Sequence, residues 1–550
     1  MWGWIPSGLR SSVARGRASA SSLCAAVAAA VAVPAPAGTA HRRCMGRPSV
    51  RQIRGDTVVF TATDEQMAAL HAYKTGENII IKAGAGTGKT STLQLLAHDQ
   101  PQRRGLYLAF NKAIATEAAK KFQGTGVVSR TVHSLAYRDF GRPFQERLDG
   151  RYQFWTVKSE ILGIRERFDL GEGVKPRFMS RQTIVRLVME TVDAFCKSAA
   201  LEITATLVPV PEGLAFTDGP AGAALHMQEF IAGYARKAWE DLSTPAGQIS
   251  YKHDYYLKRW QMSGPDLQTD FVLFDEAQDA DEIMTDVVRK QTNTQVVAVG
   301  DENQGIYGWR GAVDSMNAFG GVRTHLTQSF RFGQAIADEA NFWLDMLGSD
   351  MRLRGMAGAA SSVWKSERQP EAILTRTNMG AIRAVIDSQE RDVKVGIAGT
   401  TKAKELLFLG KAAMELREKG HTNHRDLDFF NSWQEVVDFA NEDDVGDIAA
   451  LVKVIDDYGP ERIVEAVEAT VPVEQARTVV STMHVAKGLE FFHVKIGPDF
   501  YEPGKDDDGQ QKPLTRAEAR LLYVGVTRAQ RHLDPHHIDW AKTFEGGITD

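Results

Sequence analysis

The sequence predicts an α/β protein with two core domains, each built on a parallel sheet and each carrying a mainly helical insertion. Short apolar runs recur along the chain, and several of them end directly in a polar motif, as buried parallel strands do. Two long intervals lack such runs and show helical periodicity instead. A length of 550 residues is enough for roughly three to four domains with a sizeable core.

Seven apolar runs are predicted to be buried strands. They are Ile79–Ile81, Leu106–Phe110, Phe271–Phe274, Val296–Val299, Ile373–Thr375, Val479–Thr482 and Val494–Ile496. Ligands of open α/β sheets bind beyond the carboxyl ends of the strands, so we expect the functional residues there.

These patterns divide the chain into five parts. We expect a first core domain at residues 56–145 and 251–325, around a helical insertion at 146–250. A second core domain is expected at 326–400 and 471–545, around a shorter helical insertion at 401–470. Residues 1–55 stand outside the predicted fold.

The charges are distributed unevenly along the chain. The net charge is −5, yet residues 1–55 hold eight arginines and no acidic residue. Beyond them, 57 basic residues face 70 acidic ones, a net charge of −13. Any contact with DNA in that part must therefore come from a local groove. Three cysteines without a C-x-x-C pair exclude a disulfide framework and a cysteine zinc site.

The first 55 residues resemble a targeting segment of either of two kinds. Their apolar run, Leu23 to Val33, is shorter than the roughly 20 residues that span a bilayer. The segment is similar to a secretory signal and equally to an organelle transit peptide, and a dispensable extension upstream of Met45 is a third reading. We expect no membrane partner. The expected location is the cytoplasm or nucleoid, or an organelle or the nucleus if the segment is a genuine targeting signal.

The first apolar run leads into a glycine-rich loop that suits phosphate. Glycines let backbone N–H groups turn toward phosphates, and the helix that follows adds its dipole. The pattern predicts that Lys89 reaches the β- and γ-phosphates of ATP and that Thr90 binds Mg²⁺. The residues expected to hold the nucleotide here are Ala83, Gly84, Ala85, Gly86, Thr87, Gly88, Lys89, Thr90 and Ser91.

An acidic motif, Asp275–Asp279, follows the run Phe271–Phe274. A carboxylate at the end of a buried strand suits a second contact to Mg²⁺, and its neighbour suits activation of water. We assign Asp275 to the metal and Glu276 to the general base. A solvated acidic helix start is the alternative for this motif taken alone.

A third motif, residues 299–312, combines Gln304 with two aromatic side chains and an arginine. Gln304 suits contact with the γ-phosphate. Tyr307, Trp309 and Arg310 suit single-stranded nucleic acid, because every base offers a face for stacking. Core packing is the alternative for the two aromatics, and the four glycines around them favour an exposed loop.

Two arginines further along the chain, Arg331 and Arg528, lie beside short aromatic or glycine-bearing motifs. An arginine supplied from a second domain stabilises the γ-phosphate during hydrolysis, an effect worth about 10³–10⁵ in rate. A surface ion pair is the ordinary role of such a residue, and only the set of motifs together favours catalysis.

In this order the motifs resemble those of superfamily 1 DNA helicases of the UvrD/Rep family. The P-loop is similar to their motif I. The other matching segments, from the adenine-reading Q motif through motifs Ia, Ib, II, III, IV, V and VI, are 63–66, 110–112, 131–134, 275–279, 300–312, 328–332, 482–491 and 523–529. Residues 253–256 and 326–333 look most like the helicase part of F-box DNA helicases and their bacterial or phage relatives.

The resemblance implies two RecA-like domains with ATP between them, and 3′→5′ movement on single-stranded DNA and its junctions with duplex, in repair or recombination. Gln66 then reads adenine, Phe330 stacks on it, and Glu490 binds near the nucleotide and couples it to the DNA site. Gln304, Arg331 and Arg528 surround the γ-phosphate. The residues that the resemblance turns toward DNA are Phe110, Asn111, His133, Tyr307, Trp309, Arg310 and His484.

Three departures from the family pattern limit this transfer. Ala83 replaces a glycine, which costs little where φ is negative, and Gly305 stands where serine is common. Only about 150 residues separate Arg331 from motif V, so we expect the subdomain called 2B in larger relatives to be reduced to residues 401–470. An ATPase that removes proteins from DNA without unwinding it uses the same motifs and stays open. A nuclease domain is not expected, and a small-molecule ATPase leaves motifs III to VI without a role.

Overall fold

The computed structural model describes most of the chain from Thr61 onward. The described residues are 61–109, 112–148, 153–169, 178–210, 223–306, 315–399, 402–422, 424, 427, 430, 432–440, 446–506 and 508–549. Apart from Thr61 they belong to one compact unit, Ala62–Asp550. Several predictions fall outside them, namely residues 1–55, Phe110, Asn111, Tyr307, Trp309 and Arg310.

The first sheet has six parallel strands in the order β3-β2-β6-β7-β1-β8. Its strands are β1 Ile79–Ala83, β2 Gly105–Ala109, β3 Val127–Thr131, β6 Phe271–Phe274, β7 Gln295–Gly300 and β8 Val322–Leu326. The four runs that the sequence predicts in this region are therefore strands. β1 lies between β7 and β8, so its end is flanked by two further strand ends.

Side chains of the first sheet alternate between two apolar layers, as successive residues of a strand must. Ile79 and Ile81 pack on one face, in a core shared with the helices next to them in sequence. Ile80 packs on the opposite face, together with the residues of a larger helical layer. The helices that flank this sheet are α1 Asp64–Lys74, α2 Lys89–Asp99, α3 Lys112–Lys121, α4 Val132–Ala136 and α10 Glu282–Arg289.

The interval predicted to be a helical insertion is mainly helical. Its helices are α5 Gln145–Leu148, α6 Trp155–Leu162, α7 Arg181–Lys197 and α8 Ala223–Leu242, followed by α9 His253–Met262. Ser180 caps α7 by accepting a hydrogen bond from the backbone N–H of Thr183. A two-stranded antiparallel pair, β4 Phe168–Asp169 and β5 Phe178–Met179, also lies here and has no counterpart among the predicted strands.

The second sheet also has six parallel strands, in the order β11-β12-β10-β13-β15-β9. Its strands are β9 Ser362–Val363, β10 Ala372–Thr375, β11 Val395–Ile397, β12 Thr478–Thr482, β13 Phe491–Ile496 and β15 Ala529–Asp534. The predicted α/β class with two parallel sheets is therefore confirmed. A further pair, β14 Leu514–Thr515 and β16 Ile548–Thr549, lies apart from this sheet.

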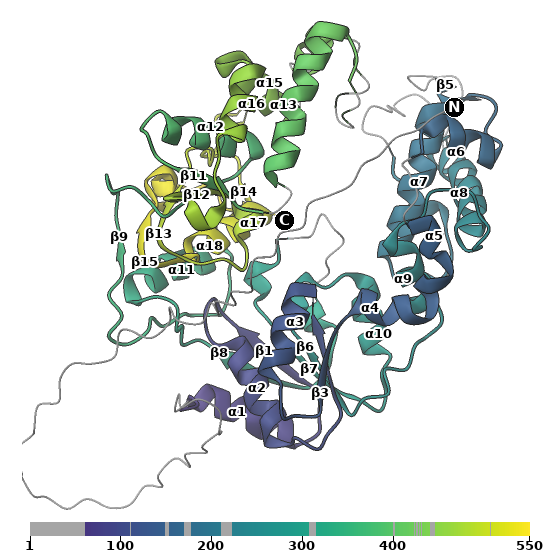
Figure 1. The fold of residues 1–550 in the computed structure, drawn as a ribbon. Coiled ribbons are helices and arrows are strands. Elements are labelled where there is room, and N and C mark those ends of the chain that lie inside the picture. Colours follow the sequence, from purple (N-terminus) through teal and green to yellow (C-terminus); the bar gives the residue numbers. More distant parts are fainter. Residues whose placement is uncertain are drawn as a thin grey trace, which may run out of the picture. The chain divides into compact units, whose positions relative to one another are not determined.

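The helices of the second half form two groups on opposite faces of the second sheet. α11 Gln334–Met346 and α18 Arg516–Val526 share one core with β13 and β15. α12 Asn378–Gln389 shares another core with β11 and β12 (Figure 1). The latter core also takes in the helices of the second insertion, which are α13 Lys402–Lys419, α14 Trp433–Ala440, α15 Gly446–Tyr458 and α16 Pro460–Glu468. α17 Met483–Ala486 follows β12 directly.

The helical character predicted for 401–470 is present, whereas the exact domain boundaries proposed from the sequence stay a prediction. Within the described residues, no helix is both long enough and apolar enough to cross a membrane.

Candidate active site

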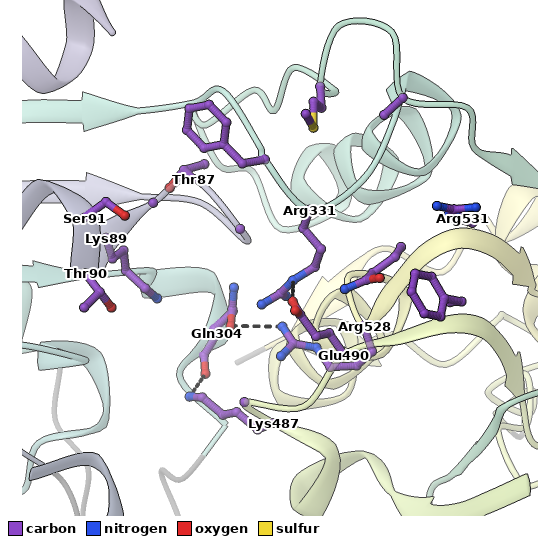
Figure 2. Close-up of a pocket in the computed structure, with 18 of the residues that line it drawn as sticks. Thr87, Lys89, Thr90, Ser91, Gln304, Arg331, Lys487, Glu490, Arg528 and Arg531 are labelled. Atoms are coloured by element: carbon purple, nitrogen blue, oxygen red, sulfur yellow. Dashed lines mark hydrogen bonds and ion pairs between the residues drawn. The ribbon is translucent and has the colours of Figure 1, made fainter. Parts of the chain in front are cut away.

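A cavity of about 1110 Å³ lies where the two halves of the described chain meet. The first half contributes the P-loop, Glu276 and Gln304. The second half contributes residues from the segments around 330, 490 and 530. Figure 2 shows Lys89 pointing into this space from one side, with Arg331 and Arg528 opposite it. The lining residues also named from the sequence are Gly86, Thr87, Gly88, Lys89, Thr90, Ser91, Glu276, Gln304, Phe330, Arg331, Glu490 and Arg528.

The P-loop connects β1 to α2 in the conformation that its glycines allow. Gly86 and Gly88 have φ values of 70° and 81°, in the left-handed region that favours glycine. A Cβ atom on Gly86 would lie 2.6 Å from the Arg331 Cβ, so the loop touches the second half of the site there. Ala83 ends β1 without a positive φ, which agrees with the tolerance expected for alanine at this position.

Lys89 and Glu276 form an ion pair inside the cavity, with Nζ 3.0 Å from Oε1. Burial opposes the charge of Glu276, but Lys89 and Lys487 outweigh burial and hold the pKa of Glu276 below its usual value. The carboxylate is therefore ionised at neutral pH, as a general base must be. Its backbone has a φ of 50°, a strained value for a residue with a side chain. Such strain concentrates at functional sites.

Asp275 is oriented by two hydrogen bonds. Its Oδ2 accepts from the Tyr107 hydroxyl at 2.5 Å, and its Oδ1 accepts from the Glu276 backbone N–H at 2.9 Å. Burial and the neighbouring Glu276 charge raise the pKa of Asp275. Tyr107 is a residue without an assigned role in the sequence reading. A tyrosine inside an otherwise apolar parallel strand is the signal for it, because a buried hydroxyl needs a partner.

The donor set for Mg²⁺ is compatible with the position proposed for it. Thr90, Asp275 and Tyr107 line a recess of about 160 Å³ next to the main cavity. A hydroxyl and a carboxylate are oxygen ligands of the kind that Mg²⁺ takes together with phosphate oxygens and water. Among the described residues, no group of three or more His, Cys, Asp or Glu side chains could hold a metal by itself.

Arg528 is a buried cation whose hydrogen-bond partners among the described residues are uncharged. Its guanidinium donates to the carbonyls of Val524 and Leu489 and to the side chains of Thr527 and Gln304. Burial and the nearby Arg331 lower its pKa to about 9. No ion pair joins Arg528 to an acidic residue of the described chain. A buried cation without an ion-pair partner favours an anionic ligand in the cavity that it lines.

Arg331 lies on the same wall of the cavity and is held from two sides. Its Nε donates to Glu490 at 2.7 Å and its Nη1 to the Thr527 carbonyl at 3.0 Å (Figure 2). Glu490 therefore contacts Arg331 directly. This contact is a concrete route for the coupling role that the sequence reading gives to Glu490.

Tyr523 and Asp301 connect the arginines to the P-loop. The Tyr523 hydroxyl donates to Asp301 Oδ2 at 2.9 Å and accepts from the Ala85 backbone N–H at 3.4 Å. The same carboxylate oxygen accepts from Gln304 Nε2 at 2.7 Å, and Gln304 accepts from Arg528. Both Tyr523 and Asp301 lie inside motifs quoted from the sequence, but no role was assigned to them. A single sequence does not reveal contacts between residues that are more than 200 positions apart, such as Tyr523 and Asp301.

Gln66 and Phe330 both lie beside Gly88 of the P-loop, and of the two only Phe330 lines the cavity. A Cβ atom on Gly88 would lie 3.3 Å from Gln66 Nε2 and 3.5 Å from the Phe330 ring. Gln66 is held by a capping box with Thr63 and donates to Thr92 at 3.2 Å. The Phe330 ring is 46% exposed. A fixed amide beside an open aromatic ring suits the adenine base that the sequence reading places here.

The described DNA candidates do not line the cavity. His133 lies in α4, just after the end of β3, and its Nε2 is 3.6 Å from Asp254. This contact lowers the pKa of Asp254. His484 lies in α17, just after the end of β12. Both residues therefore occupy carboxyl ends of strands, while the other five candidates lie outside the described residues.

The fold and the site define a P-loop nucleoside triphosphatase whose cavity is completed by a second parallel-sheet domain. Residues 62–319 match the model of the UvrD/REP helicase N-terminal domain, so this stretch of the chain is a domain of that kind.

Similar proteins extend this likeness over most of the chain. The chain is 31% identical over 512 residues to F-box DNA helicase 1 of Gallus gallus, covering 86% of this chain and 48% of that protein. It is 28% identical over 519 residues to F-box DNA helicase protein 1 of Schizosaccharomyces pombe (strain 972), covering 86% and 57%. The chain thus spans about half the length of the curated relatives it matches.

Among solved structures, a complex of the Arterivirus nonstructural protein 10 (helicase) with DNA is similar at 12% identity and a TM-score of 0.29. The match covers 85% of this chain and 62% of that one. The assignment of the fold rests on the two sheets described above rather than on this likeness.

Proposed function

We propose that this chain is an ATP-driven motor that moves 3′→5′ along single-stranded DNA and separates strands at junctions with duplex. The observation that carries the proposal is the convergence of Lys89, Glu276 and the two arginines on one cavity. A P-loop with a base on one side and cations from a second domain on the other is the arrangement that hydrolyses a nucleoside triphosphate.

The residues of the first half, together with Phe330 of the second, bind the nucleotide and activate water. The P-loop N–H groups and Lys89 hold the phosphates, while Phe330 and Gln66 hold the base. Glu276 accepts a proton from the attacking water. When bound by Thr90 and Asp275, Mg²⁺ supplies charge neutralisation at the β- and γ-phosphates.

Nucleotide binding must rearrange contacts that this structure contains. Lys89 pairs with Glu276, and Arg331 pairs with Glu490. Phosphates compete for both cations, so binding frees Glu276 for water and draws Arg331 and Arg528 toward the γ-phosphate. Hydrolysis removes that attraction. Because the arginines come from the second half, the cycle changes the distance between the two halves.

Contact with DNA is proposed at the strand ends that carry His133 and His484, together with the segment 307–312. Bases that stack on aromatic side chains hold a strand by about 1–3 kcal/mol each, enough to keep a position during one cycle. The proposed process is repair or recombination of DNA, in the cytoplasm or nucleoid, or in an organelle or the nucleus if residues 1–55 are a genuine targeting segment. The names of the two similar proteins, both called F-box DNA helicases, support DNA as the substrate.

Steady-state ATP hydrolysis tests the motor. We expect strong stimulation by single-stranded DNA and little by blunt duplex or RNA. Lys89→Ala is expected to abolish hydrolysis, and Glu276→Gln to lower kcat by about 10²–10⁴ while nucleotide still binds. Glu302→Gln is the matched control, because Glu302 pairs with Lys82 and does not line the cavity. A rate of ATP hydrolysis that single-stranded DNA does not change contradicts the proposal.

Strand displacement tests unwinding and its polarity. A duplex with a single 3′ tail is expected to be unwound, and the same duplex with a 5′ tail is not. If DNA stimulates hydrolysis but neither duplex is unwound, the chain is instead the ATPase that clears proteins from single strands. An assay that follows release of a bound protein from DNA then replaces the unwinding assay.

A further inference from the structure

The two faces of the second sheet are covered unequally. α11 and α18 share an apolar core with β13 and β15 on one face. On the other face, the core under α12 takes in residues of β10, β11 and β12 and, among the described residues, none of β13 or β15. β9 is the edge strand beyond them (Figure 1). Parallel sheets are normally covered on both faces, so an open part of one is a candidate binding surface.

The open part carries aromatic rings in contact with each other. His493 of β13 and His532 of β15 are register partners, and their ring centroids are 4.5 Å apart. The ring of Trp364, just beyond β9, is 4.8 Å from that of His532. Trp364 is 53% exposed, although tryptophan is usually well buried. We call this surface the outer face, defined by Trp364, Arg368, His493, Lys495, His532 and His537.

The outer face ends in a pocket of about 310 Å³ beside α12. The pocket is lined by four cationic side chains, by His537 and by two acidic side chains, Glu367 and Asp387. The four cations are Arg368, Arg383, Arg391 and Lys495. Arg383 is paired with Asp457 at 2.6 Å. Among the described residues no ion pair joins Arg368, Arg391 or Lys495 to an acidic residue.

A nearby aspartate makes no ion pair with these cations in the described chain. Asp534 is the register partner of Lys495, but its two oxygens accept hydrogen bonds from the backbone N–H groups of Ser366 and His536, each at 3.2 Å. The pocket thus holds cations and carboxylates together, and Arg368 and Lys495 are the cations of the outer face that make no ion pair among the described residues.

His493 and His532 of the outer face are neutral rings at physiological pH. Burial, the neighbouring His532 and the charge of Arg368 lower the pKa of His493 to about 4. Burial and Arg368 also lower the pKa of His532. The Nε2 atoms of both rings are buried and have no hydrogen-bond partner in the described chain. The face thus combines uncharged aromatic rings with unpaired cations.

We propose that the outer face binds a second strand of single-stranded DNA, with backbone phosphates at Arg368 and Lys495 and a base stacked on Trp364. Alternating aromatic and cationic side chains are what a single strand needs, because its bases stack and its phosphates seek cations. An acidic peptide needs the cations but not the open indole ring. The inference rests on the proposed function, since strand separation produces two single strands and the motor carries one.

The test compares two duplexes that differ in one tail. One has a single tail for the motor, and the other has in addition a non-complementary second tail of about ten nucleotides. Binding of the full chain is measured by fluorescence anisotropy without nucleotide. We expect the unaltered chain to bind the two-tailed duplex about tenfold more tightly.

Two substitutions separate phosphate contact from stacking. Arg368→Glu and Trp364→Ala are each expected to remove most of the tenfold gain. Arg368→Glu should also lower the slope of log affinity against log salt by about 0.7, because one phosphate contact to a single strand is lost. Trp364→Ala should leave that slope unchanged. A purely structural effect of either substitution does not produce this difference.

Lys394→Glu is the matched control, because Lys394 is exposed beside β11 at the opposite edge of the same sheet. It is expected to keep the gain. Hydrolysis stimulated by the one-tailed duplex should be unchanged in all three variants. If the unaltered chain shows stimulated hydrolysis but no gain from the second tail, this inference is wrong and the proposed motor stands. A gain that survives both Arg368→Glu and Trp364→Ala equally overturns it, and a protein partner becomes the occupant to seek.

Discussion

Lys487, directly after α17, donates to both carboxylate oxygens of Asp279, with Nζ 2.7 Å from Oδ1 and 2.5 Å from Oδ2. The same ammonium donates to the Gln304 carbonyl at 2.5 Å (Figure 2). The side chains of Lys487 and Asp279 are 9% and 5% exposed. Since α17 follows the second sheet and Asp279 follows β6 of the first, this buried ion pair joins the two halves of the site beside Glu276.

Lys487→Met is expected to destabilise the chain by about 3 kcal/mol at pH 7.5, because it leaves the buried Asp279 carboxylate without a partner. Burial raises the pKa of Asp279 to about 6 even beside Lys487, and losing the lysine raises it further. A folded-state pKa above the unfolded value means that the folded chain binds the proton more readily. The difference in unfolding free energy between Lys487→Met and the unaltered chain should therefore shrink as the pH falls through about 6.

Urea unfolding at pH 7.5 and 5.5 measures this deficit. The double variant Lys487→Met/Asp279→Leu is the control, since it removes both charges and should recover most of the lost stability. An equal deficit at the two pH values would show that Asp279 is not the source of the loss.

Tyr523→Phe removes the hydroxyl that connects Asp301 to the Ala85 backbone. We expect a loss of about 1 kcal/mol in unfolding free energy. We also expect a fall in kcat of about tenfold, because the orientation of Gln304 depends on Asp301. Stopped assays at saturating ATP measure kcat.

Tyr255→Phe is the control for Tyr523→Phe. The Tyr255 hydroxyl is also buried and donates to Asp193 at 3.4 Å, in the helical insertion away from the cavity. It should lower stability without changing kcat. If both variants lose kcat alike, a general loss of packing explains the effect and Tyr523 has no special position.

Gly86→Ala is expected to raise the KM for ATP strongly and to lower stability. The left-handed backbone costs an alanine about 1–2 kcal/mol, and the new Cβ would lie 2.6 Å from Arg331 Cβ. Gly76→Ala separates the two causes, because Gly76 has a φ of 82° but nothing within 4 Å of the added atom. It should lose stability alone. Equal KM values in the two variants would rule out the steric cause.

Glu65→Gln is expected to lower the melting temperature at pH 7. Glu65 accepts hydrogen bonds from the Thr327 backbone at 2.8 Å and its hydroxyl at 2.5 Å, and pairs with Arg354 at 2.9 Å. Burial raises the pKa of Glu65, but these bonds outweigh it and leave the pKa lowered. This stabilisation exists above the unfolded pKa of about 4.3 and disappears as the pH falls through the folded value.

Melting curves of Glu65→Gln and the unaltered chain should therefore converge toward pH 3.5. Glu474→Gln, at an exposed position, is the control and should not change the melting temperature at either pH. Curves that stay equally far apart in acid would contradict the role of the carboxylate charge.

The strands predicted from the sequence are those with apolar side chains on both faces, such as β6 and β7. The strands that the sequence reading did not predict include the edge strands β3, β9 and β11. An edge strand is short or half-exposed, so it has no continuous apolar run to recognise. β15 also escaped prediction, because the face that carries His532 and Asp534 is not part of the apolar core.

The features of the candidate site likewise divide into those that the sequence predicts and those that it does not. The P-loop, the acidic motif and the arginines were recognisable because each is a contiguous segment with its own chemistry. The pairs Lys89–Glu276, Tyr523–Asp301 and Lys487–Asp279 were not, because their members lie 187, 222 and 208 residues apart. One sequence contains no signal for such distances.

The sequence by itself determined the α/β class, the position of the phosphate loop and the chemical types of the catalytic candidates. Local patterns decide these features, since strand burial, glycine content and the chemistry at strand ends depend on residues that are close together in the sequence. Only the tertiary structure decided which acid faces which cation, and which face of the second sheet stays open. Those outcomes depend on how the two sheets and their helices pack, and packing is a property of the whole chain.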